Sequence, residues 1–273
     1  MNTNDIMQTA LDLAGFSAVR GESTIFVEGE SICKVLFGID INDNDLIEAK
    51  RQGYNLVISH HPPNRVFTER FCEDIENQID LLVRHGVATD KAIAAVQPTL
   101  DLYRRWNENR DHKKIVSLAQ KIGMPLMNIH QPCDELGRRY LQAIVEEIGV
   151  NATIGDLIAR FSQIPEIQES DETVELVCGS LASPIGNAVV FHGVGTNGGY
   201  TAATALFETG IKTVIYIHLF PHQESDRELL IKESKGNLIL TGHYASDWIG
   251  VNILIRKLEE SGITVTPKNS SHS

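Results

Sequence analysis

Two adjacent prolines end an apolar stretch of this sequence immediately after a pair of histidines. The stretch reads LVISHHPP over residues 56–63. Proline has no backbone N–H for a sheet ladder, and Pro62 also disfavours helical backbone at His61. Because neighbouring side chains of a strand point to opposite faces, His60 and His61 can converge only where the strand breaks. The pattern predicts a metal site at a strand end, and the alternative is a chance pair used for capping or hydrogen bonding.

Two later segments each place a histidine four residues before an aspartate. They are HQPCD at residues 130–134 and GHYASD at residues 242–247, and each follows an apolar run. On a helical turn this spacing puts both side chains on one face, about 5 to 6 Å apart at Cβ. Imidazole and carboxylate together suit zinc, manganese, iron(II) or cobalt. Since ligand crevices of open α/β sheets lie at the carboxyl ends of strands, we expect the three segments to converge.

The order SHHP, H-x-x-x-D and GHY-x-x-acid resembles the Nif-three-like family of dinuclear metal proteins, which are also called GTP cyclohydrolase I type 2 homologues. The resemblance is firmest over residues 33–62, 124–149 and 236–253. It implies that two divalent ions per chain, zinc, iron, manganese or cobalt, are held by a set of five ligands: His60, His61, Asp134, His243 and Asp247. It also implies that His130 lies near the metals, where it could act catalytically by relaying a proton or orienting Asp134.

The sequence departs from the family pattern at three places. Pro63 follows HHP where the family usually has leucine, and residues 130–134 read HQPCD where the family reads HTNLD. Asp247 stands where the family usually has glutamate, which is one methylene longer. The shorter side chain can still bridge metals if the backbone lies closer, with a changed spacing and metal preference.

The resemblance implies a metal-dependent hydrolase that acts on a small molecule or nucleotide, in the manner of GTP cyclohydrolase I type 2. Two ions would lower the pKa of a bridging water and polarise the substrate. The alternative is a nonenzymatic metal-handling or interaction scaffold protein. The family also forms toroids, so we expect a homohexameric ring, in line with the closed symmetry of most oligomers.

A glycine-rich stretch, HGVGTNGGY, covers residues 192–200 and contains G-x-G-x-x-G at Gly193, Gly195 and Gly198. No acidic residue ends the following strand, which argues against a dinucleotide cofactor. Two interpretations remain, an anion-binding or substrate-binding nest and a tight strand-to-helix turn. His222 follows Pro221 and is a candidate for contacting the substrate or supporting the metal ligands, as are His218 and His192. The alternative for all three is a structural role.

Composition restricts the class of partner and the compartment. The chain has 24 Lys and Arg against 36 Asp and Glu, a formal charge of −12, which argues against nonspecific nucleic-acid binding. The four cysteines are scattered without a C-x-x-C pair. The first 16 residues lack the basic start and apolar core of a secretory signal, and no stretch approaches a membrane span. We therefore expect a cytoplasmic protein.

Strand and helix patterns alternate, which predicts an α/β protein with two lobes of mixed or parallel sheets flanked by helices. A strand at 34–39, a helix at 43–52 capped by Asn42 and a strand at 55–59 predict a βαβ unit. Further helices are expected at 72–85, 90–106, 134–148, 199–209, 223–234 and 247–260, with strands near 173–178, 187–192, 213–217 and 237–241. The loose polar stretch 150–172 predicts lobes at 1–150 and 151–273, with 238–273 packing back on the first lobe to deliver His243 and Asp247.

Overall fold

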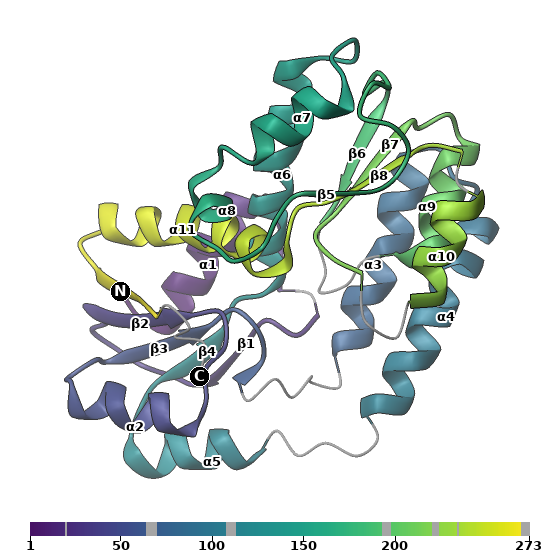
Figure 1. The fold of residues 1–273 in the computed structure, drawn as a ribbon. Helices are drawn as coiled ribbons and strands as arrows, with labels where there is room; N and C mark the ends of the chain where they lie inside the picture. The colour runs from purple at the N-terminus through teal and green to yellow at the C-terminus, as the bar shows by residue number, and fades with distance from the viewer. Residues whose placement is uncertain are drawn as a thin grey trace. The chain divides into compact units, whose positions relative to one another are not determined.

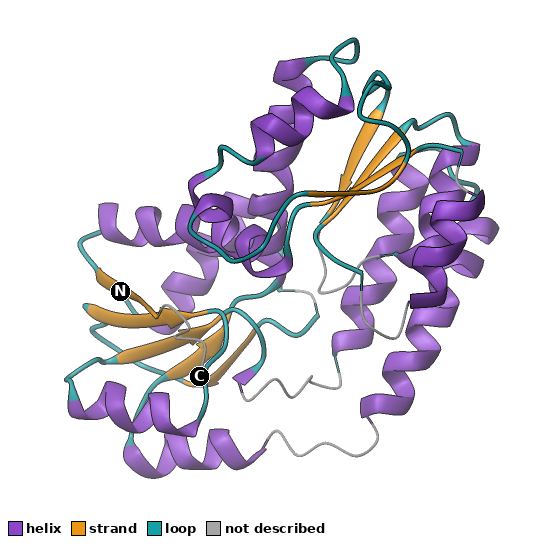
Figure 2. Cartoon of the chain, in the orientation of Figure 1, coloured by secondary structure: helices purple, strands orange, loops and turns teal. Residues whose placement is uncertain are grey.

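The computed structural model describes residues 1–19, 21–63, 70–107, 113–192, 198–219, 224–233 and 235–268 (Figures 1 and 2). The helices are α1 (Thr3–Ala14), α2 (Asp43–Arg51), α3 (Phe71–Arg84), α4 (Thr89–Asn107), α5 (Lys113–Ile122), α6 (Gln131–Ile148), α7 (Ile154–Phe161), α8 (Pro165–Gln168), α9 (Gly199–Glu208), α10 (Glu224–Glu233) and α11 (His243–Glu260). The strands are β1 (Thr24–Val27), β2 (Lys34–Gly38), β3 (Leu56–Ser59), β4 (Leu126–Asn128), β5 (Glu175–Cys178), β6 (Ala188–Phe191), β7 (Thr213–Tyr216), β8 (Asn237–Leu240) and β9 (Thr264–Lys268). Among the described residues, no helix is both long enough and apolar enough to cross a membrane. The α/β class predicted from the sequence is confirmed.

The chain divides into two compact units that interleave along the sequence. Unit 1 comprises Met1–Asp74, Tyr103–Leu136 and Gly250–Ser273, and unit 2 comprises Ile75–Leu102 and Gly137–Ile249. This division differs from the boundary expected at residue 150. Its physical basis in unit 1 is strand pairing, because β9 adds to the edge of the sheet beside β2. Residues 250–273 belong to unit 1, whereas His243 and Asp247 belong to unit 2.

The sheet of unit 1 has the strand order β1-β4-β3-β2-β9. Strands β4, β3, β2 and β9 run parallel, and β1 pairs antiparallel with β4. The β2-α2-β3 segment is the predicted βαβ unit, and Asn42 forms the expected N-cap of α2 within a capping box. One face of the sheet packs on α2 and α5 through buried apolar residues that include Leu46, Val57 and Ile115.

The sheet of unit 2 has the order β5-β8-β7-β6, with β8, β7 and β6 parallel and β5 antiparallel to β8. Its three parallel strands are buried apolar runs, as expected for strands covered on both faces. Helices α9 and α10 occupy the crossovers between them.

The two sheets repeat one arrangement. The order β1-β4-β3-β2 in unit 1 matches β5-β8-β7-β6 in unit 2, and each unit has its strands in the same chain order. In both units the antiparallel edge strand pairs with the strand that leads into a long helix, β4 into α6 and β8 into α11. Each unit therefore presents the carboxyl ends of neighbouring parallel strands beside a helix N-terminus, which is where ligands of α/β proteins bind.

Several elements differ from the sequence expectation. Residues 150–172 contain α7 and α8 rather than a loose boundary, because Thr153 and Asp156 form a capping box and Pro165 opens α8. Helix α6 begins at Gln131 rather than Asp134, since proline is tolerated in a first turn and Pro132 lies there. Helix α11 likewise begins at His243 rather than near 247.

Candidate metal centre

Three histidines of unit 1 follow the carboxyl ends of two adjacent strands. His60 and His61 come directly after β3, and His130 follows β4. The parallel pairing with β2 continues beyond Ser59, because His60 N–H donates to the Gly38 carbonyl at 2.8 Å and His61 N–H to the Ile39 carbonyl at 2.9 Å. The backbone ladder thus holds both histidines in register up to the prolines, where the strand ends as predicted.

Each of the three imidazoles is held at its Nδ1 atom by an acceptor. His60 Nδ1 lies 3.2 Å from the Ile129 carbonyl oxygen, and His130 Nδ1 lies 2.5 Å from Glu22 Oε1. His61 Nδ1 lies 3.0 Å from Asp40 Oδ1. Since a carbonyl or an ionised carboxylate only accepts, each Nδ1 is the donor in its contact, and in a neutral ring the lone pair is then on Nε2. Metal-binding histidines show this same pattern, with the second ring nitrogen donating to a carboxylate or a carbonyl.

The three rings and Asp134 form one group, which we call the unit 1 cluster: His60, His61, His130 and Asp134. The ring centroids lie 4.6 to 5.3 Å apart. One nitrogen from each ring lies within 4.8 Å of the others, a spacing that a metal ion can fill. The two oxygens of Asp134 lie 3.2 Å from His60 Nε2 and 3.6 Å from His130 Nε2. The predicted residues of this unit are thus brought together, and His130 is grouped with the donors as well.

Burial of this cluster fits a cation. The side chains of His60 and Asp134 are 0% and 2% exposed. A buried carboxylate is costly unless a positive charge or several hydrogen-bond donors compensate it. Neutral imidazoles directing Nε2 atoms towards such a carboxylate form a donor set for a borderline divalent ion.

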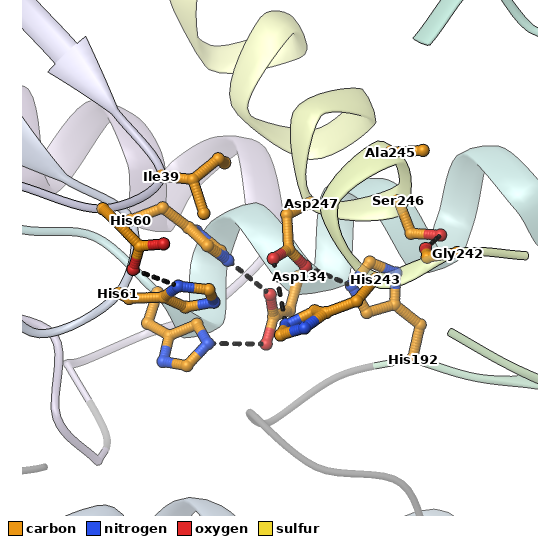
Figure 3. A network of polar contacts seen from close by, with 12 residues as sticks. Ile39, His60, His61, Asp134, His192, Gly242, His243, Ala245, Ser246 and Asp247 are labelled. Carbon is orange, nitrogen blue, oxygen red and sulfur yellow. Dashed lines mark hydrogen bonds and ion pairs between the residues drawn. The ribbon is translucent and has the colours of Figure 1, made fainter. Parts of the chain in front are cut away.

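A second group lies in unit 2, and we call it the unit 2 cluster: His192, His218, His243 and Asp247. His192 follows β6, His218 follows β7, and His243 opens α11 after β8. Asp247 is buried, with Oδ2 3.2 Å from His243 Nε2 and Oδ1 3.6 Å from His192 Nε2 (Figure 3). The rings of His218 and His243 are 4.3 Å apart. The predicted pair of His243 and Asp247 therefore faces across one helical turn, as its spacing requires.

The first turn of α11 is fixed by a carboxylate from the segment before β5. Glu172 accepts hydrogen bonds from the backbone N–H groups of His243 and Ala245, each at 2.9 Å. Gly242 has φ +93°, and a Cβ there would lie 2.9 Å from the Glu172 side chain. The glycine therefore permits both the turn and the approach of the cap. Together they place His243 and Asp247 on the helix.

Two glycines of the glycine-rich stretch, Gly198 and Gly199, are among the described residues. Gly193, Gly195 and His222 lie outside them. Gly198 is the N-cap of α9, and a Cβ there would lie 2.2 Å from Ala202 Cβ. Asp226 already accepts the Tyr200 N–H in the first turn at 2.8 Å. Close packing and an occupied backbone donor support the tight-turn interpretation at Gly198.

The structure adds four residues to the site that the ligand prediction did not include: Glu22, Asp40, Glu172 and His192. Asp40 and His192 had a visible signal, because Asp40 follows the predicted strand 34–39 and His192 ends the predicted strand 187–192. The two glutamates precede edge strands, and nothing local in their sequence marks them. Their role depends on which strand the edge strand pairs with.

No family model and no curated protein matches the chain. Among solved structures, it is similar to a NIF3 superfamily protein from Sphaerobacter thermophilus, with 35% identity, 98% of each chain covered and a TM-score of 0.89. It also has the fold of reduced HcgD from Methanocaldococcus jannaschii, at 12% identity over 98% of this chain and 97% of that one, with a TM-score of 0.61. A Bacillus cereus protein related to NIF3 matches at 11% identity over 100% and 98%, with a TM-score of 0.54. The long match at 35% identity shows that this chain belongs to the NIF3 superfamily.

Proposed function

We propose that this protein binds two divalent metal ions per chain and uses them as a metal-dependent hydrolase of a small molecule or nucleotide. The proposed ligands are those implied by the sequence: His60, His61, Asp134, His243 and Asp247. The observation that carries the proposal is the unit 1 cluster, where three imidazoles anchored at Nδ1 direct their Nε2 atoms towards one another and a buried carboxylate. This is the arrangement of metal-binding histidines with their supporting acceptors.

The chain's own groups have distinct tasks in this proposal. Asp134 and Asp247 supply the negative charge that holds the ions, and the imidazoles complete the donor sets. His130 keeps Nε2 unprotonated on the side of Asp134, so it can accept a proton there. A bound ion would supply a water of lowered pKa and polarise the substrate.

We take the substrate class from the family resemblance, in which GTP cyclohydrolase I type 2 chemistry is the named activity. A ring-opening hydrolysis of a nucleotide base and the hydrolysis of a phosphoester both need an activated water and a polarised electrophile. A substrate panel should therefore include nucleotides, phosphoesters and cyclic amides.

The test is turnover of that panel by the full chain loaded with zinc, manganese, iron(II) or cobalt. We expect product with at least one metal, and loss of product in Asp134→Ala. Glu28→Gln is the matched control, because Glu28 is exposed and lies outside both clusters. A fully metal-loaded protein without turnover would overturn the hydrolase and leave a metal-binding protein.

A further inference from the structure

The turn before β1 places two residues against His130. The antiparallel pairing of β1 with β4 puts Thr24 opposite Asn128, so residues 22 and 23 come alongside residues 129 and 130. Ser23 Oγ accepts the backbone N–H of His130 at 3.0 Å. Glu22 Oε1 accepts the ring Nδ1–H of the same residue at 2.5 Å. The backbone and the ring of His130 are thus held by consecutive residues of one turn.

In the part of the chain that the structure describes, the Glu22 carboxylate has one hydrogen-bond partner, the His130 ring. Its carboxylate is 0% exposed, and its second oxygen, Oε2, has no hydrogen-bond donor among the described residues. A buried carboxylate is costly unless hydrogen-bond donors compensate it, and within the described ranges the Nδ1–H of His130 is the one donor to this carboxylate. The cost is explained if the pair serves the orientation of His130.

The backbone of Glu22 is also fixed by a hydrogen bond to Asp74. Its N–H donates to Asp74 Oδ2 at 2.9 Å. Gly21 has φ +62°, and a Cβ at this position would lie 1.6 Å from Asp74 Oδ1. Only glycine therefore allows Asp74 to reach the turn. Burial, and next the charge of Glu22, raise the pKa of Asp74 well above its ordinary value.

Unit 2 uses the equivalent position differently. Glu172 precedes the antiparallel edge strand β5 as Glu22 precedes β1, but Glu172 accepts from backbone N–H groups at the start of α11. One glutamate fixes a helix start and the other fixes an imidazole. The contact to the His130 ring is therefore a property of the Glu22 side chain rather than a general consequence of the repeated topology.

We propose that Glu22 is a positioning residue that fixes the tautomer and orientation of His130, so that the Nε2 lone pair of this ring is kept for a metal ion or a substrate proton. The ion and the substrate rest on the proposed function, whereas the tautomer is a property of the metal-free chain. Removing the acceptor frees the ring to exchange its proton between Nδ1 and Nε2. Supporting contacts of this kind are worth about 10- to 100-fold in metal affinity.

The first test is nitrogen NMR of the histidine rings in the metal-free full chain, with His130→Ala used to assign the His130 signals. We expect a fixed Nδ1–H tautomer in the wild type, its loss in Glu22→Met, and its retention in Glu22→Gln, which keeps an acceptor. Glu28→Met is the matched exposed control. An Nε2–H tautomer in the wild type, or an unchanged tautomer in Glu22→Met, would overturn the proposal.

The second test is a double-mutant cycle on the affinity for zinc. We expect Glu22→Met to weaken binding about 10- to 100-fold when His130 is present and to have no effect in the His130→Ala background. Equal weakening in both backgrounds would show a merely structural role and overturn the proposal. If the wild type binds no zinc, manganese, iron(II) or cobalt, the proposed function fails, and the tautomer measurement decides the role of Glu22 by itself.

Discussion

Asp134 Oδ1 lies 3.2 Å from His60 Nε2, and both side chains are almost completely buried. His60 directly follows β3, and Asp134 lies in the first turn of α6, which follows β4, so the two residues meet because β3 and β4 are parallel neighbours. A buried carboxylate that faces the lone pair of an imidazole is stabilised when a cation lies between them. The first prediction follows from this relationship.

The protein purified without chelator and with metals supplied should carry close to two divalent ions per chain. His60→Ala and His243→Ala should each lose at least one ion, because each removes a proposed ligand. Elemental analysis measures the stoichiometry. His85→Ala, outside both clusters, is the control and should keep the full content. A wild type with a metal content near zero would contradict the ligand set.

Acid should release the metal. Imidazole must be neutral to bind an ion, so protons compete with the metal below the ordinary histidine pKa of about 6.5. We expect the affinity for zinc to fall steeply between about pH 7 and pH 5. Titrations with a competing chelator at a series of pH values check this. A constant affinity over that range would mean that carboxylates alone hold the ions.

Asp74→Asn should stabilise the protein at neutral pH. The pKa of Asp74 is raised from 3.8 in the folded state, first by burial and then by Glu22. The stability linked to this proton is therefore complete below the unfolded pKa and is lost as the pH rises through the folded pKa. Asparagine cannot ionise, so Asp74→Asn avoids this loss, and we expect a higher free energy of unfolding than in the wild type at pH 7.

Urea unfolding at pH 7 and near pH 4 measures this effect, and the difference between Asp74→Asn and wild type should shrink at the lower pH. Asp80→Asn lies on the same helix, α3, but is exposed, and it should change little at either pH. A destabilised Asp74→Asn at pH 7 would show that Asp74 is ionised and needed as a charge.

Glu172 should stabilise the start of α11. Glu172→Ala leaves the N–H groups of His243 and Ala245 without this acceptor, so we expect a loss of about 0.5 to 2 kcal/mol in the free energy of unfolding. Glu172→Gln keeps one acceptor and loses only the charge at a helix N-terminus, worth about 0.3 to 1 kcal/mol. Chemical denaturation gives both values. Glu169→Ala is the exposed control, and an equal effect of all three variants would refute the capping role.

We also predict a closed homo-oligomer, a hexameric ring, which the family resemblance implies. Light scattering coupled to size exclusion should give six times the 30.2 kDa chain mass at micromolar concentration and physiological salt. A monodisperse monomer under these conditions would rule out the ring.

Much of the site could be predicted because its signals are local. The prolines after His60 and His61 end a strand, and the spacing of His243 and Asp247 matches a helical turn that the structure contains. The cap at Asn42 and the apolar strands were equally readable, since each depends on residues a few positions apart. Pro98 lies inside α4 without ending it, as the predicted helix 90–106 required.

The features that could not be predicted from the sequence depend on contacts between residues that are far apart in the chain. Strand β1 has four half-buried residues and no alternating pattern, so neither the strand nor the contact of Glu22 with His130 was visible. The capping box of Thr153 and Asp156 could be seen in the sequence. The many polar residues of 150–172 nevertheless led to the prediction of a loose boundary rather than of helices. The division into two interleaved units could not be predicted either, because no local sequence pattern indicates that β9 pairs with β2.

The pairing of β9 with β2 also determines when the sheet of unit 1 can be completed during synthesis of the chain. Strand β2 leaves the ribosome long before its partner β9, with which it pairs from Lys34 and Thr264 to Gly38 and Lys268. Until then β2 is an open sheet edge, to which a strand of another nascent chain can add. When β9 arrives, Lys268 donates to the carbonyl of Asp40 and to the carboxylate of Asp45. The segment that orients His61 therefore receives this support only after β9 has been made, so products truncated before Thr264 should aggregate rather than accumulate as apoprotein.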